Sequence, residues 1–198
     1  MFKSHLLFIR VYMHPKNDLE GLDVVYQLKS VYRFGQVGDR QESAAEHSWS
    51  CLLVADLFLD KISKPLNRLR VYELLMYHDL VEVIAGDTPL GPEFEHIDKE
   101  TLEANASKEL RKQLPHPLDK RFVDLHEEFI AQETREAVFA KLVDGFESDT
   151  FTRKADADWS SWTKEYHDSK RLKYFEAFPE LKPYYDELQR QLVEQGVL

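Results

Sequence analysis

The chain has 198 residues, of which 43% are hydrophobic and 7 are glycine, so it can bury one sizeable core without disulfides or repeats. Its formal net charge of −10 opposes binding of long nucleic acid, which needs clustered Lys and Arg. The single Cys51 cannot form an internal disulfide and no apolar run is long enough to span a membrane, so we expect a cytoplasmic protein with a packed thiol.

The chain begins with a short apolar segment over residues 1–10. Arg10 interrupts this segment and no small-residue cleavage site follows, so we expect no signal peptide. Asp18 is predicted to cap a helix that runs to about Tyr32 with apolar residues at helical spacing. Residues 33–40 contain two glycines and no sustained periodicity, which predicts a loop.

Two strongly apolar helices are predicted next. Apolar density rises from Glu42 to Leu59, which predicts a buried helix. Residues 69–85 predict a third helix that is apolar nearly all round and therefore central. Gly86 can end this helix, and a turn-rich connection follows over residues 86–92.

The second half of the chain reads as a series of amphipathic helices. Residues 93–113 are densely charged with apolar residues at helical spacing, which predicts an exposed helix. Prolines then separate it from two further helices, at 118–131 and 133–154. Pro179 divides a final pair of helices, whose aromatic residues we expect in the core: Tyr174, Phe175, Phe178, Tyr184 and Tyr185.

These elements together predict the fold class. No alternating strand pattern of useful length is present, so we expect an all-α fold. We further expect a single domain over residues 1–198, with its main body at about 18–154 and C-terminal helices at 160–198.

Three ionisable residues interrupt the most apolar stretch of the chain, residues 74–85. They are His78, Asp79 and Glu82, and on a helix their spacing would direct them toward one neighbourhood. Burying such groups without partners costs several kcal/mol, so they must be neutralised, hydrogen-bonded or coordinated. A metal ion would satisfy this requirement.

The chain contains a second His-Asp pair at His167-Asp168. It lies in the charged run 164–171, which predicts a solvent-exposed helix face. We therefore expect no function from this pair.

Two further residues could join the first pair at a metal site. His47 lies near the start of the second helix, where a lone histidine is often a hydrogen-bonded core or cap residue. Asp144 interrupts an apolar run, where it could pair with Lys141 or Arg153. Combined with the His-Asp pair, however, they give two imidazoles and two carboxylates, a suitable ligand set for Mn²⁺, Fe²⁺, Co²⁺, Ni²⁺ or Zn²⁺.

The order of these motifs resembles a known family. Glu46-His47, His78-Asp79 and Asp144 resemble the His, His-Asp, Asp signature of HD-domain phosphohydrolases. Residues 40–43 and 86–89 are similar to the small single-domain branch that includes bacterial 5'-deoxynucleotidases. This resemblance implies an HD-domain helical bundle that hydrolyses nucleoside 5'-monophosphates with a divalent metal and often forms a homodimer.

The resemblance also implies roles for individual residues. It makes His47, His78, Asp79 and Asp144 the ligands of one divalent ion, which could be Mn, Co, Fe, Ni, Zn or Mg. Asp79 and Glu82 would be the catalytic residues, with Glu82 as the acid/base that positions water. The expected substrate-binding residues are Arg33, Phe34, Arg40, Asp87 and Thr88.

These substrate roles leave a choice open. Arg33 or Arg40 could hold the phosphate, since either guanidinium can make a bidentate contact. Phe34 would pack against the sugar, and Asp87 in the Gly-Asp-Thr turn with Thr88 would contact a sugar hydroxyl. Phe34 stands where the branch has a larger ring, so preference between ribose and deoxyribose is open.

Other hydrolase classes fit the sequence less well. A (p)ppGpp hydrolase would carry a second acidic residue where Val83 stands. A second metal would need further histidines, and of His96, His116 and His126 the first lies on a charged helix and the second between prolines, so one ion is favoured. The patterns of zinc proteases and P-loop enzymes are missing. A non-catalytic nucleotide-binding or regulatory protein containing a metal, or an HD hydrolase of another phosphorylated metabolite, stays open, and Glu82 discriminates between binding and catalysis.

Overall fold

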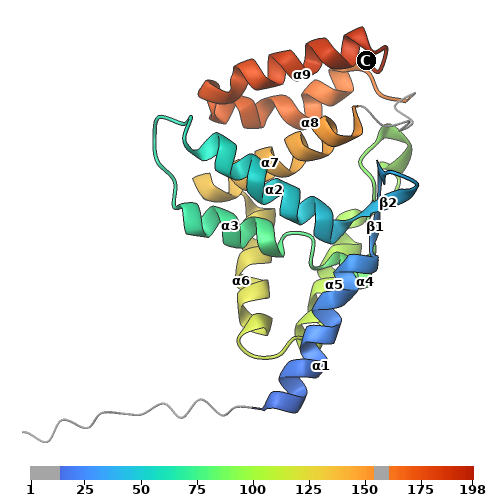
Figure 1. Cartoon of the computed structure of the whole chain (residues 1–198), viewed down its shortest axis with the longest axis vertical. Coiled ribbons are helices and arrows are strands. Elements are labelled where there is room, and N and C mark those ends of the chain that lie inside the picture. The colour runs from blue at the N-terminus through green and yellow to red at the C-terminus, as the bar shows by residue number, and fades with distance from the viewer. Residues whose placement is uncertain (1–13, 154–160) are drawn as a thin grey trace, which may run out of the picture.

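The computed structural model of the protein describes residues 14–153 and 161–198 (Figure 1). The α-helices are α1 (Pro15–Tyr26), α2 (Ala44–Leu59), α3 (Arg68–Tyr77), α4 (Glu82–Ala85), α5 (Lys99–Gln113), α6 (Leu118–Ala131), α7 (Arg135–Thr152), α8 (Lys164–Ala177) and α9 (Lys182–Glu194). The strands are β1 (Tyr32–Val37) and β2 (Arg40–Ser43), and the 3-10 turns are η1 (Gln27–Ser30), η2 (Pro92–Phe94) and η3 (Pro179–Leu181). The prediction that residues 1–10 form no signal peptide falls outside the described residues. So does the predicted boundary at 154–160 between the main body and the C-terminal helices.

Helices dominate the fold, which confirms the predicted all-α class. Figure 1 shows α2 and α7 through the middle of the molecule, α8 and α9 at the top, and α1, α5 and α6 at the bottom. Helix α7 contacts α2, α3, α6 and α8, so it lies at the centre of the packing. Four of the five C-terminal aromatic residues are buried in the common core and Tyr184 is partly buried against it, as predicted.

The main error in the predicted elements is the loop at 33–40, which is a β-hairpin. Strands β1 and β2 pair antiparallel with Val37 opposite Arg40, and the two turn residues begin with Gly38 at φ 62°. A positive φ at this position suits glycine in a tight hairpin turn. Gly35 brings β1 close to α7, since a Cβ atom there would lie 2.5 Å from the Phe151 ring. The predicted first helix consequently stops at Tyr26 and continues only as the turn η1.

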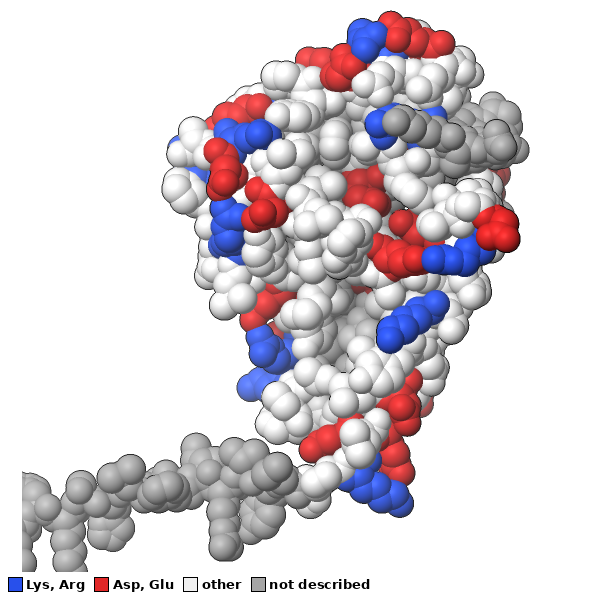
Figure 2. All heavy atoms as spheres, viewed as in Figure 1, with Lys and Arg blue, Asp and Glu red and all other residues white. Residues whose placement is uncertain are grey.

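Helix α2 begins where predicted, but only one of its faces is buried. The side chain of Ser43 accepts a hydrogen bond from the Glu46 amide and the Glu46 carboxylate accepts one from the Ser43 amide, which forms a capping box. Trp49, Leu53 and Leu57 on the opposite face are more than half exposed. Figure 2 shows uncharged surface over the middle of α2, while charged side chains of both signs lie at the left, where α2 ends and α3 begins. There Arg68 pairs with Asp56 and Asp60. Among the described residues, no helix is long and apolar enough to cross a membrane.

The predicted third helix is interrupted at the His-Asp pair. Helix α3 ends at Tyr77, and residues 78–81 form a tighter turn before α4. The amide of Leu80 donates to the Tyr77 carbonyl at 3.1 Å, and the amide of Glu82 donates to the Asp79 carbonyl at 2.9 Å. Each of these bonds joins residues three positions apart instead of four, so the backbone is wound more tightly here than in an α-helix. Gly86 ends α4 at φ 74°, as its sequence position predicts.

The later helices lie close to their predicted positions. Helix α6 has the predicted bounds, and the helix expected at 133–154 is α7, which begins after the Thr134 cap. The helix expected at 93–113 is shorter, because η2 and a loop precede α5.

The prediction that His167 lies on an exposed face was wrong. His167 is fully buried, with Nε2 3.1 Å from an Asp149 carboxylate oxygen, and it also contacts Tyr185. The same carboxylate accepts two hydrogen bonds from Arg171, at 2.7 and 2.9 Å. Positions 167 and 171 are one helical turn apart, so they share the face of α8 that packs on α7, and the charged neighbours lie on other faces.

Candidate functional site

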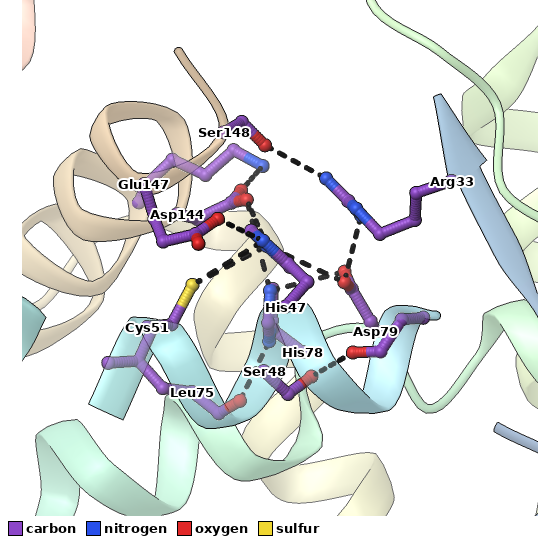
Figure 3. A network of polar contacts seen from close by, with 12 residues as sticks. Arg33, His47, Ser48, Cys51, Leu75, His78, Asp79, Asp144, Glu147 and Ser148 are labelled. Atoms are coloured by element: carbon purple, nitrogen blue, oxygen red, sulfur yellow. Dashed lines mark hydrogen bonds and ion pairs between the residues drawn. The ribbon is translucent and has the colours of Figure 1, made fainter. Parts of the chain in front are cut away.

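The four residues predicted as metal ligands lie together in the structure. His47 Nε2 is 3.2 Å from Asp144 Oδ1 and 3.8 Å from Asp79 Oδ2. His78 Nε2 is 3.2 Å from Asp79 Oδ1 and 3.8 Å from Asp144 Oδ1. Each imidazole thus faces both carboxylates (Figure 3). We refer to these residues below as the four-residue cluster.

Three separate elements bring the cluster together. His47 lies in the first turn of α2, the capped end of that helix. His78 and Asp79 lie in the tight turn that follows α3, and Asp144 lies in the middle of α7. Because α7 packs against both α2 and α3, ligand atoms nearly 100 positions apart in the sequence meet in the interior.

The second ring nitrogen of each histidine is also engaged. His47 Nδ1 is 2.6 Å from Glu147 Oε2, and His78 Nδ1 is 2.8 Å from the Leu75 carbonyl oxygen. Both contacts use Nδ1, which leaves Nε2 of each ring facing the cluster. His78 Nε2 is buried and has no hydrogen-bond partner among the described residues. Such an orphaned nitrogen beside two carboxylates fits a coordinated cation.

The surroundings of His78 and Asp144 favour the protonation states that metal binding requires. Burial lowers the pKa of His78, which favours the neutral imidazole that a metal requires. Burial acts to raise the pKa of Asp144. Two contacts outweigh burial and hold this pKa well below its usual range: the Lys141 ammonium 2.9 Å away and the hydrogen bond with His47. Burial acts to lower the pKa of His47, but its contacts with Cys51 and Asp144 outweigh this and raise the pKa well above its usual value. His78 thus offers a neutral nitrogen and Asp144 an anionic oxygen, whereas His47 must lose a proton when a cation binds.

Two other groups of potential ligands overlap the cluster. The ligand atoms of His47, Cys51 and His78 lie within 4.8 Å of one another, and so do those of Glu42, His47 and Glu147. Cys51 Sγ lies 3.4 Å from Nε2 and 3.9 Å from Nδ1 of His47, which places the sulfur against the ring. Burial raises the pKa of this thiol to about 12, so it is protonated at neutral pH. Glu147 is already engaged by Nδ1 of His47, so the four-residue cluster is the better metal site.

Arg33 approaches the cluster from strand β1. Its guanidinium donates to Asp79 Oδ2 at 3.1 Å, to Asp87 Oδ1 at 3.5 Å and to Ser148 Oγ at 2.9 Å. Glu82 Oε1 lies 3.9 Å from the same guanidinium. Arg33 is thus a partly buried, permanently charged donor beside the cluster, suited to an anionic group that binds there.

Glu82 is buried beside Asp79 and lines the same space. Burial and the Asp79 carboxylate raise its pKa to about 9, although Arg33 opposes this shift. Its Oε2 atom has no hydrogen-bond partner among the described residues. Glu82 therefore holds a proton at neutral pH when no cation is bound, and it has an acceptor free to contact water.

A cavity of about 550 Å³ opens onto the cluster. The residues around the cluster form one end of it, and the loop after α4 and helices α5, α6, α7 and α8 form the rest. Its aromatic lining residues are Phe34, Phe94, Phe129, Trp162 and Tyr174. A pocket with convergent charged groups at one end and aromatic walls is suited to a small organic anion.

The structure separates the predicted substrate-binding residues into two sets. Arg33, Phe34, Asp87 and Thr88 line the cavity. Arg40 lies outside the cavity lining on the exposed hairpin, where its guanidinium contacts both carboxylate oxygens of Glu46, at 2.8 and 2.5 Å. Of the two arginines, only Arg33 reaches the cluster.

Sequence reasoning missed two residues of the site. Glu147 contacts His47, and Ser148 accepts a hydrogen bond from Arg33. The available signal was their spacing on α7, since residues three or four positions from Asp144 share its side of the helix. Lys141, one of the two partners that the sequence offers for Asp144, pairs with it at 2.9 Å and lines the cavity.

Comparisons with known proteins identify relatives of this chain. It is 33% identical over 132 residues to the 5'-deoxynucleotidase HDDC2 of Bos taurus, a match that covers 65% of this chain and 63% of the relative. It is 37% identical over 91 residues to the 5'-deoxynucleotidase yfbR of Photorhabdus temperata, which covers 42% of this chain and 46% of the relative. The chain thus matches less than two thirds of the length of these curated relatives.

A solved structure is similar over nearly the whole chain. The crystal structure of a "Predicted metal-dependent phosphohydrolase" from Magnetospirillum magnetotacticum MS-1 has a TM-score of 0.75 and 28% identity, and the match covers 92% of this chain and 94% of that one. The profile of the HD domain family matches residues 25–180, which include the hairpin, the four-residue cluster and α8. The chain therefore belongs to the HD domain family, as its His, His-Asp and Asp pattern predicts.

Proposed function

We propose that the protein is a divalent-metal-dependent phosphohydrolase that removes phosphate from ribo- or deoxyribonucleoside 5'-monophosphates. The observation that carries the proposal is the four-residue cluster at one end of a cavity, with Arg33 beside the cluster and the unpartnered His78 Nε2 within it. Relatives carrying the name 5'-deoxynucleotidase support the substrate class.

His47, His78, Asp79 and Asp144 would hold one divalent ion, for which Mn, Co, Fe, Ni, Zn and Mg are all candidates. The mixed nitrogen and oxygen donor set favours a first-row transition ion over Mg²⁺, which prefers oxygen ligands alone. When bound, the ion would lower the pKa of a coordinated water and stabilise negative charge on the phosphoryl oxygens.

The protein's own residues would bind and orient the substrate. Arg33 would donate to phosphate oxygens while Ser148 and Asp87 keep its guanidinium in place. Glu82 would contact the attacking water through its unpartnered carboxylate oxygen and exchange a proton with it. Phe34 and Asp87, with Thr88, would contact the sugar at the wall of the cavity.

The test is phosphate release from a panel of ribo- and deoxyribonucleoside mono- and triphosphates, using metal-stripped protein with Mn²⁺, Co²⁺ or Mg²⁺ restored. We expect metal-dependent release from the monophosphates. The ratio of ribo to deoxyribo activity, compared with variants at Phe34 and Asp87, reports their contact with the sugar. No release by protein that binds metal would favour a different phosphorylated substrate or a nucleotide-binding protein.

Three expectations remain predictions. They are the cytoplasmic location, the homodimer implied by the family resemblance, and the single-domain organisation over residues 1–198. Sedimentation of the purified protein tests the assembly state directly.

A further inference from the structure

We infer that Glu147 is a positioning residue of the metal centre, which orients His47 so that its Nε2 faces Asp79 and Asp144. The inference rests on the proposed metal site. It assigns to Glu147 a role in the strength of metal binding, and no contact with the substrate.

The contact between Glu147 and His47 is short and enclosed. Glu147 Oε2 lies 2.6 Å from His47 Nδ1, and both side chains are buried. Figure 3 shows Glu147 on the opposite side of the His47 ring from Asp79. A carboxylate at this distance accepts a hydrogen bond from Nδ1–H, so the Nε2 lone pair remains available for a cation.

The geometry of α7 makes this arrangement specific. Asp144 and Glu147 are three residues apart on one helix, and they contact the two different nitrogens of the same ring. One helical turn thus supplies both a candidate ligand and the group that orients the neighbouring ligand. Any movement of α7 relative to α2 would disturb both contacts together.

His78 provides an internal comparison. Its Nδ1 is held by the Leu75 carbonyl, a neutral acceptor, whereas the acceptor for His47 is a carboxylate. A charged acceptor makes the imidazole a stronger donor to a metal, and loss of such a partner typically reduces metal affinity about 10–100-fold. We therefore expect Glu147 to affect metal affinity even though it lies outside the four-residue cluster.

The experiment measures the dissociation constants of Co²⁺ and Mn²⁺ by competition with a chromophoric chelator, alongside thermal unfolding of the metal-free protein. Glu147→Gln keeps an oxygen acceptor but removes its charge, and Glu147→Ala removes both. We expect about tenfold weaker metal binding for Glu147→Gln and a loss closer to 100-fold for Glu147→Ala. Glu147→Gln should keep the unfolding temperature of the metal-free wild type, which separates positioning from a loss of fold.

Asp149→Asn is the matched control, because Asp149 is a buried carboxylate on the same helix that binds Arg171 and His167. It should lower the unfolding temperature and leave metal affinity unchanged. Wild-type affinity in Glu147→Gln, or an equal loss in Asp149→Asn, would overturn the inference while leaving the metal centre intact. If wild-type protein binds neither ion, or His78→Ala binds as tightly as wild type, the proposed centre itself fails and the role of Glu147 fails with it.

Discussion

Arg33 and Asp79 share a hydrogen bond of 3.1 Å between the guanidinium and the carboxylate that also faces both imidazoles. One carboxylate therefore contacts a permanent cation on one side and the candidate metal site on the other. This position makes Asp79 the link between the proposed metal and the proposed phosphate contact of Arg33. Replacing Asp79 should therefore weaken both metal binding and the placement of Arg33.

We expect Asp79→Asn to lose bound metal. The amide keeps the size of the side chain but removes a negative charge, and a neutral amide is a poorer ligand for a divalent cation. Metal content of the purified protein, measured by elemental analysis after dialysis against a fixed metal concentration, checks this. Full metal content in Asp79→Asn would exclude it from the ligand set.

Glu82→Gln should separate catalysis from binding. The residue lies beside the cluster without belonging to it, so metal content and nucleotide affinity should stay near wild-type values. Turnover should fall roughly 100-fold or more, the usual contribution of a general acid or base. Steady-state kinetics with a titration of nucleotide binding give both quantities. Unchanged turnover would reject this role and favour the binding-protein alternative.

Arg33→Lys and Arg40→Lys form a matched pair. Loss of a charge-assisted hydrogen bond costs about 1.5–3 kcal/mol, so Arg33→Lys should lower kcat/KM on the order of tenfold or more. Arg40 pairs with Glu46 on the exposed hairpin, so Arg40→Lys should leave kcat/KM nearly unchanged. The reverse order of effects would assign the phosphate contact to Arg40.

Asp149→Asn should change the dependence of stability on pH. Burial acts to raise the pKa of Asp149, but Arg171 and the hydrogen bond with His167 outweigh it and lower this pKa. The stabilisation is therefore present above the unfolded pKa of about 3.9 and is lost as the pH falls through the lower folded value.

At pH 7 we expect Asp149→Asn to unfold about 3–5 kcal/mol more easily, because it leaves the partly buried Arg171 without its partner. The difference from wild type should shrink as the pH falls below about 4. Urea unfolding at several pH values measures it, with the exposed Asp124→Asn as control. A constant difference across this range would contradict the assignment.

Much of the fold and the cluster could be predicted because burial shapes the sequence directly. Apolar spacing located α6 and most of α7, and ionisable residues within apolar runs identified His78, Asp79 and Asp144. The hairpin escaped detection because its strands are short, β2 is polar throughout, and Gly35 interrupts the apolar alternation of β1. Its role is to bring Arg33 to the cluster, which depends on close packing of Gly35 on α7 and on no local periodicity.

Contacts between distant elements account for the other differences. The roles of Glu147 and His167 depend on which side chains face them from other helices. Spacing from Asp144 places Glu147 on the same side of α7, but it does not identify His47 as the partner of Glu147. The tight turn at His78 was missed because apolar periodicity continues through it, although the backbone hydrogen bonds change there.

The glycine that follows Asp144 connects the candidate site to the C-terminal helices. A Cβ atom at position 145 would lie 2.7 Å from the Arg171 guanidinium, which Asp149 holds in place. Glycine within a helix usually costs about 1 kcal/mol, yet here it makes room for the ion pair of Arg171 with buried Asp149. Positions 145 and 171 thus pack as a pair. In a relative whose residue equivalent to Gly145 carries a side chain, we expect a residue smaller than arginine at the position equivalent to Arg171.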